Sequence, residues 1–140
     1  MQARAVPVAV VPKAWPLVVG WVTEALVKGK ADETPQEILE RLLTGKQQLW
    51  LAWDEELGRA RGICITELFD SARGKACNLA LVAGRDFKGW QHLTEAVKAF
   101  ARSMGCVRLE AAGRKGWERR AKADGWRHLR STVEMRLDDG

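Results

Sequence analysis

The chain has 140 residues, 46% of them hydrophobic and 29% charged, and its formal net charge is +5. This composition is ordinary for a soluble globular protein, and the length lets one domain bury about two-thirds of its unfolded surface without disulfides or metals. Residues 101–130 hold nine Lys or Arg and three acids. Such a positive region either binds an anionic partner, nucleic acid or a phosphorylated cofactor, or is a solvated helix face.

The cysteines and histidines do not form a recognisable site. Cys64, Cys77 and Cys106 are odd in number, lack C-x-x-C spacing, and lie in or beside apolar runs. We therefore predict reduced, buried and unreactive thiols. His92 and His128 lie far apart with no third ligand, so no zinc site is predicted. The chain has no Tyr, which removes one common general acid.

The N-terminal segment does not read as a secretion signal. Residues 6–11 are too short for the apolar region of a signal peptide, and Pro7 interrupts them. No stretch approaches the run of about 18 apolar residues that a membrane-spanning helix needs. We expect a soluble protein of the cytoplasm with no membrane contact.

The predicted elements begin with a strand over residues 6–11. It should lie at a sheet edge, because Pro7 cannot donate a ladder hydrogen bond. A helix then starts with Pro16 at its first position and ends at Gly29. Its apolar residues recur with helical spacing, at Trp15, Val18, Val19, Val22 and Leu26.

A capping box indicates the second helix. Thr34 can cap the first amides, Pro35 fits the first helical position, and Glu37 completes the box. Gly45 is a natural residue just past the helix end. The buried stripe is expected at Ile38, Leu39, Leu42 and Leu43.

Three strands should follow as an antiparallel meander. Residues 48–53 form a continuous apolar run, as expected of a strand covered on both faces. Residues 60–69 are rich in β-branched side chains, and residues 75–83 form the third strand. Because short turns connect them, neighbouring strands are predicted to pair antiparallel.

A helix and a strand come after the meander. From Trp90 to Met104 the apolar residues are spaced three and four apart, which predicts a helix of about four turns that stops at Gly105. Residues 107–111 then return as a strand.

The last segment is predicted to form a helix and one or two strands. The helix covers residues 116–124 and ends at Gly125, and the strand or strands cover residues 127–137. Trp117 and Trp126 flank this helix and should anchor it to the sheet. The whole order predicts one α/β (α+β) domain over residues 1–140, a mixed sheet of six or seven strands flanked by about four helices.

This element order resembles the GNAT superfamily of acyl-CoA-dependent N-acyltransferases over residues 6–137. The family often ends with an Asn, an Ala three residues on, a Tyr seven on, and a Gly-Phe pair at eleven and twelve. The corresponding positions here keep the Gly-aromatic pair and are similar to those of small GNAT-like proteins of tailed phages. They are Arg114, Trp117, Ala121, Gly125 and Trp126.

The resemblance implies a site for acetyl-CoA. In the family the pantetheine arm lies between the strands equivalent to residues 75–83 and 107–111, and the following loop wraps the pyrophosphate with its amides. Arg85 and Lys88 would neutralise the phosphates, and this loop keeps one of the family's two small residues. The implied cofactor-binding residues are Leu81, Val82, Ala83, Gly84, Arg85, Asp86, Phe87, Lys88, Gly89, Trp90 and Arg114.

The catalytic groups are less clearly marked. The family's usual general acid, a Tyr, falls on Ala121. Glu67 and Glu110 alternate with apolar neighbours, so each is a candidate general base that faces the site or else a solvent-facing strand residue. Catalysis in this family rests mostly on positioning of the amine and the thioester, which does not demand strong acid or base residues.

Three functions remain open at this level. The first is transfer of an acetyl group from acetyl-CoA to an amine that the sequence does not specify. The second is a catalytically silent GNAT-fold protein, of a kind phages encode, that acts in the host cytoplasm by binding a protein partner or a second copy. The third is a nucleic-acid-binding module that uses the basic helix face of Lys115, Arg119 and Lys122.

Overall fold

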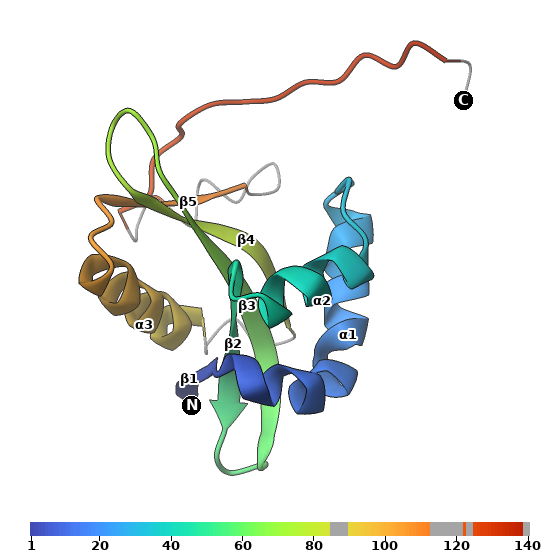
Figure 1. Ribbon diagram of the computed structural model, residues 1–140, viewed down its shortest axis with the longest axis vertical. Helices are drawn as coiled ribbons and strands as arrows, with labels where there is room; N and C mark the ends of the chain where they lie inside the picture. The colour runs from blue at the N-terminus through green and yellow to red at the C-terminus, as the bar shows by residue number, and fades with distance from the viewer. Residues whose placement is uncertain (85–89, 113–121, 123–124, 139–140) are drawn as a thin grey trace.

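The computed structural model describes residues 1–84, 90–112, 122 and 125–138. Its five strands form one sheet in the order β1-β2-β3-β4-β5, antiparallel except for the parallel β4–β5 pair. Helices α1 and α2 cover one face and α3 covers the other (Figure 1). The elements are β1 (Gln2–Val6), η1 (Val8–Val10), α1 (Val11–Lys28), α2 (Pro35–Leu43), β2 (Gln47–Asp54), β3 (Arg59–Phe69), β4 (Ala76–Gly84), α3 (Trp90–Ser103) and β5 (Arg108–Ala111).

The α1/α2 side of the sheet holds a closed apolar core. Helix α1 buries residues at helical spacing, and α2 adds Ile38 and Leu42, each at most 2% exposed. The sheet contributes Ile63 and Ile65 of β3, both fully buried. Removing this much apolar surface from water is the main source of stability on this side.

The α3 side has a second core, built around a tryptophan. Leu93 and Val97 of α3 are buried against Trp50, whose ring centroid lies 5.4 Å from that of Phe100 in an edge-on contact. The Trp50 Nε1–H donates to Thr66 Oγ1 at 3.1 Å, which satisfies the polar atom of a buried indole.

Most of the predicted elements are confirmed. Thr34 caps α2 with the complete capping box, and Gly45 follows the helix end with a φ of +77°. The three-stranded meander is β2, β3 and β4, and α3 and β5 lie where the spacing placed them. Gly105 follows α3 with a φ of +82°, the left-handed conformation that ends a helix.

The N-terminal prediction is wrong in two places. The first strand is Gln2–Val6 and does not cover residues 6–11, although it does lie at the sheet edge beside β2. Helix α1 starts at Val11, so Pro16 lies inside the helix and Pro12 takes the first turn. The apolar residues after Pro7 enter a 3-10 turn and the helix because Val11 is buried in the core.

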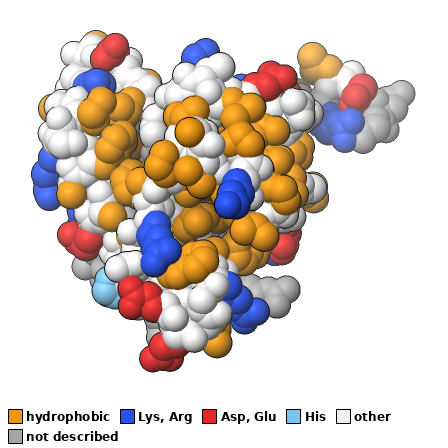
Figure 2. Space-filling view, turned by 60° about the horizontal axis from the view of Figure 1, so that its bottom comes forward, with side chains coloured by type: hydrophobic (Ala, Val, Ile, Leu, Met, Phe, Trp, Pro, Cys, Tyr) orange, Lys and Arg blue, Asp and Glu red, His pale blue; other side chains and the backbone are white. Residues whose placement is uncertain are grey.

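The expectation that no segment is long and apolar enough to span a membrane is also corrected. Residues Val8–Lys28 form a helical stretch long and apolar enough to cross a membrane by length and composition. One side of it forms the core of the α1/α2 layer, which is why the stretch is so apolar. Its other side still carries Leu17 and Val27, 77% and 74% exposed, and Figure 2 shows hydrophobic side chains gathered over the half of the molecule that α1 occupies.

The prediction of one or two final strands over residues 127–137 is wrong. Residues 126–137 form neither strand nor helix in the structure, and the last of them lead away from the sheet (Figure 1). The helix predicted over residues 116–124 lies outside the described residues except for Lys122. Trp126 is half-buried and packs against the α3-side core. The described sheet therefore has five strands, fewer than the six or seven predicted.

Candidate functional site

Strands β4 and β5 pair at their beginnings and then separate. The parallel ladder joins Ala76 to Arg108 and ends where Leu79 meets Ala111. Strand β4 continues to Gly84 and stays paired with β3 on its other side. Within the described residues, no strand pairs with residues 80–84 on the β5 side. We call residues 80–84 of β4, with the end of β5, the β4–β5 fork.

A β-bulge at Ala80 sets the orientation of the fork. Leu79 lies opposite Thr66 and Leu81 lies opposite Ile65, so Ala80 has no partner on β3. The extra residue shifts the alternation, because Leu79 belongs to the α3-side core whereas Leu81 belongs to the α1/α2-side core. Ala80 and Val82 are left exposed on the α3 side, where only small or medium side chains line the fork.

Gly84 closes β4 in a conformation that only glycine accommodates. Its φ is +147°, and a Cβ there would lie 2.6 Å from Gly62 Cα and 2.7 Å from the Arg61 carbonyl oxygen. The end of β4 therefore crosses β3 at backbone contact distance. This gives Gly84 a packing role that is independent of the cofactor role predicted for it.

The predicted cofactor-binding residues are only partly described. Leu81 is 6% exposed and Ala83 packs against the same α1/α2-side core, whereas Val82 is 41% exposed. A ligand that adds to β4 as a strand would bind the backbone of these residues, so their side-chain burial does not conflict with the prediction. Trp90 begins α3. Arg85, Asp86, Phe87, Lys88, Gly89 and Arg114 lie outside the described residues.

The two predicted bases lie on one face of the sheet. The register aligns Gln47 with Glu67, Glu67 with Asn78, and Asn78 with Glu110, so these residues form a polar row across four strands on the α1/α2 side. The Gln47 Nε2–H donates to Glu67 Oε1 at 3.2 Å. Gln47 is only 3% exposed, and its Oε1 has no hydrogen-bond partner among the described residues.

Glu110 forms ion pairs with two arginines. Arg108 Nε donates to its Oε1 and Arg130 Nη2 donates to its Oε2, each at 3.1 Å. Burial of the carboxyl group alone would raise its pKa, but these two arginines outweigh it and hold the pKa of Glu110 below its usual range. Because both oxygens already accept hydrogen bonds from cations, Glu110 is a weak proton acceptor.

The buried cysteines are unreactive. Burial, reinforced by the neighbouring Cys106, raises the pKa of the Cys77 thiol to about 11. Burial, with a smaller contribution from Cys77, also raises the pKa of the Cys64 thiol. Neither thiol forms appreciable thiolate at neutral pH, so the prediction of inert, reduced cysteines is confirmed for these two. Cys106 is half-buried and also free.

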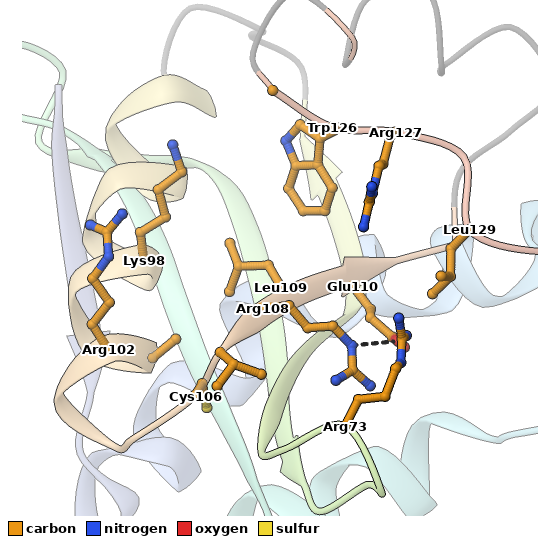
Figure 3. Close-up of a pocket in the computed structure, with 13 residues that line it drawn as sticks. Arg73, Lys98, Arg102, Cys106, Arg108, Leu109, Glu110, Trp126, Arg127 and Leu129 are labelled. Carbon is orange, nitrogen blue, oxygen red and sulfur yellow. Dashed lines mark hydrogen bonds and ion pairs between the residues drawn. The ribbon is translucent and has the colours of Figure 1, made fainter.

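A basic pocket of about 350 Å³ lies beside β5 (Figure 3). Leu109 and Trp126 line the pocket on the face of the sheet that α3 covers. Arg108 and Glu110 form their ion pair on the opposite face of β5. The excess of Lys and Arg in residues 101–130 indicated this positive region, but its members from other segments could not be identified without the fold. The basic side chains that line it are Arg73, Lys98, Arg102, Arg108 and Arg127.

Comparison with known proteins identifies the fold. No family model and no curated protein matches the sequence. A probable acetyltransferase is similar with a TM-score of 0.72 at 15% identity, covering 100% of both chains. A predicted acetyltransferase of Clostridium acetobutylicum, solved with acetyl-CoA, has a TM-score of 0.71 at 11% identity, covering 97% of this chain and 96% of that one.

A third similar structure is an enzyme with a stated substrate. Glucosamine-6-phosphate N-acetyltransferase of Arabidopsis thaliana has a TM-score of 0.64 at 14% identity, covering 98% of each chain. At these identities the likeness shows the fold alone. The chain therefore has the GNAT fold, a mixed α+β architecture that it shares with acetyltransferases.

Proposed function

We propose that the protein is an acyl-CoA-dependent N-acetyltransferase of the cytoplasm that transfers an acetyl group to an amine. The observation that carries the proposal is the β4–β5 fork, where five residues of an internal strand have no described strand as a partner on one side. A similar structure with this fold contains acetyl-CoA. The β4–β5 fork fits the pantetheine arm of that molecule, because an amide-containing chain can pair with free strand backbone.

The chain offers distinct groups for each part of the cofactor. The backbone of residues 80–84 would hold the pantetheine arm. The methyl group of Ala80 and the absence of a side chain at Gly84 leave room for it. The amides of residues 84–90 would bind the pyrophosphate, with Arg85 and Lys88 supplying positive charge. Arg114 would lie near the phosphate end. When bound, acetyl-CoA supplies the activated thioester.

Glu67 is the better of the two proposed bases. An amine acceptor is protonated at neutral pH and must lose a proton before it can attack a thioester. Glu67 lies one strand from the fork and accepts a hydrogen bond from a neutral amide, whereas Glu110 is neutralised by two arginines. We assign proton removal to Glu67, directly or through water, and a positioning role to Glu110.

Calorimetric titration with acetyl-CoA and with CoA tests the proposal. We expect micromolar binding that weakens in Arg85→Ala and Lys88→Ala. Val82→Trp should abolish binding without lowering the melting temperature, because it fills the β4–β5 fork from an exposed position. Leu57→Trp is the matched control, since Leu57 is also exposed and lies in the β2–β3 turn. A folded protein that binds neither ligand at millimolar concentration would contradict the proposal.

The second candidate is a catalytically silent protein that keeps the fold for binding. Two observations favour it: the chain has no Tyr to act as general acid, and Glu110 is committed to ion pairs. An amine-acceptor screen distinguishes the two functions. Acetyl-CoA binding without turnover on any amine would support the silent alternative, whereas turnover that falls in Glu67→Gln would support the enzyme.

A further inference from the structure

Helix α1 is apolar on the side that faces away from the sheet. The helical stretch Val8–Lys28 is apolar enough to cross a membrane, yet only 22% of it is buried inside the structure. A helix on the surface of a globular protein normally has polar residues opposite its buried stripe. Leu17 and Val27 are instead 77% and 74% exposed. The core therefore accounts for one side of α1 and leaves the other side unexplained.

The exposed apolar residues of η1 and α1 form one surface, which we call the α1 outer surface. Those in α1 lie on the side of the helix opposite to Val18 and Val22, which are buried in the core. Trp15 and Trp21 are half-buried, so each indole packs on the core and is still partly accessible. The residues of the surface are Val8, Ala9, Val10, Pro12, Pro16, Leu17 and Val27.

The charges around the α1 outer surface are mostly positive. Residues 1–23 contain two basic residues, Arg4 and Lys13, and no acid. Arg4 is opposite Leu51 on the α1/α2 side of the sheet, and the first acid, Glu24, is paired with Lys28. In Figure 2, basic side chains lie among the gathered hydrophobic ones, and the acidic side chains lie around them. A partner of this surface should therefore be both apolar and anionic.

We propose that the α1 outer surface binds the surface of an anionic lipid bilayer, with α1 parallel to the membrane plane. The acyl chains would receive Leu17 and Val27, and the anionic headgroups would neutralise Lys13. The half-buried Trp15 and Trp21 suit the boundary between headgroups and acyl chains, because an indole has an apolar ring and one N–H donor. Such a protein is peripheral and remains on the cytoplasmic side of the membrane.

The structure favours this partner over two others. A helix that spanned the bilayer would have to leave the sheet, and Val11, Val18 and Val22, each at most 1% exposed, would be lost from the core. A second copy of the chain would present the same surface in a two-fold interface. The basic side chains of Arg4 and Lys13 would then face those of the other copy and repel them.

Co-sedimentation with lipid vesicles tests the proposal. The full chain should bind vesicles made of equal parts phosphatidylcholine and phosphatidylglycerol, and should bind pure phosphatidylcholine at least about tenfold more weakly. Added salt should weaken the binding to the anionic vesicles. Lys13→Glu should weaken it about tenfold. Lys46→Glu makes the same charge change at an exposed position after α2 and should weaken binding by less than about threefold.

A matched pair of double substitutions identifies the surface that binds. Leu17→Gln/Val27→Gln should weaken binding at least about tenfold, because it removes two apolar side chains from the bilayer. Val133→Gln/Leu137→Gln replaces the same residue types where they are 93% and 97% exposed in the C-terminal segment, and should leave binding unchanged. Since all four positions are exposed, both variants should keep the circular dichroism and the melting temperature of the parent.

Several results would overturn the proposal. They are no binding of the full chain to anionic vesicles, equal affinity for neutral and anionic vesicles, or equal losses in the two double variants. A dimer that dissociates in Leu17→Gln/Val27→Gln would assign the surface to a second copy and would overturn it as well. The β4–β5 fork opens on the α3 side, away from α1, so no outcome depends on acetyl-CoA binding.

Discussion

The α1/α2 side of the sheet and the β5 edge use the same kinds of residue but differ in how completely they are covered. On the α1/α2 side, Val18, Val22 and Leu42 are at most 1% exposed. Val107, just before β5, is 65% exposed, and Val133 in the C-terminal segment is 93% exposed. The first region is closed by its own helices, and the second is not closed by any described part of the chain. Substitutions should therefore change stability in the first region and binding or assembly in the second.

Leu42→Ala should show the largest effect, because it opens a cavity in the closed region. Leu42 is 1% exposed, and replacing a buried Leu with Ala costs about 2–5 kcal/mol of unfolding free energy. Leu43→Ala is the matched control on the same helix, since Leu43 is 41% exposed and should cost less than about 1 kcal/mol. Urea denaturation measures both. Equal losses would contradict the contrast between covered and uncovered positions.

Gly84→Ala tests the boundary between the two regions, where β4 leaves the core and enters the β4–β5 fork. The added Cβ would lie 2.6 Å from Gly62 Cα in a backbone conformation with φ of +147°. We expect a loss of about 1–3 kcal/mol, the usual cost of a strained backbone residue. Gly20→Ala is the control in the middle of α1, where a Cβ meets nothing within 4 Å and should stabilise by about 0.5–1 kcal/mol. Thermal unfolding shows whether each variant is less or more stable than the parent.

Thr66→Val tests a polar contact inside the α3-side core. Thr66 Oγ1 accepts a hydrogen bond from Trp50 Nε1 at 3.1 Å and donates one to Gln48 Oε1 at 2.8 Å. The isosteric change leaves both partners unsatisfied, so we expect a loss of about 1–3 kcal/mol and a shift in tryptophan fluorescence. Thr23→Val removes an exposed hydroxyl and should change stability by less than about 0.5 kcal/mol. A neutral Thr66→Val would show that the network is not stabilising.

The predictable parts of the fold are those that local chemistry specifies. The capping box at Thr34 and the stop at Gly105 are short-range signals, and the structure follows them. Helix α1 was misplaced because proline was assigned to a helix start, whereas burial of Val11 extends the helix past Pro16. In that segment the tertiary core overrides the local preference.

The candidate site could be predicted only in outline, because it depends on strand register. Glu67 and Glu110 were chosen singly, and only the pairing of both strands with β4 shows that they share a row with Asn78. The bulge at Ala80 has no marker in the sequence, since it is an offset between two strands. The strand predicted over residues 127–137 does not form, because alternation of apolar residues at Val133, Met135 and Leu137 specifies a strand only where a neighbouring strand pairs with it.

Of the four stability substitutions, Glu110→Gln should have the smallest effect. The pH dependence of that effect distinguishes a lost ion pair from a change in packing. Because the two arginines hold the pKa of Glu110 below the ordinary value of 4.5, its ionised form contributes stability above that pH, and the contribution is lost as the pH falls through the lowered pKa. We expect Glu110→Gln to cost about 1 kcal/mol at neutral pH, because one of its partners is largely exposed. The difference from the parent should vanish in acid. Glu56→Gln, at an exposed position of the β2–β3 turn, should track the parent throughout. A cost that persists at low pH would mean that Glu110 acts by packing, and that its ion pairs with Arg108 and Arg130 contribute nothing to stability.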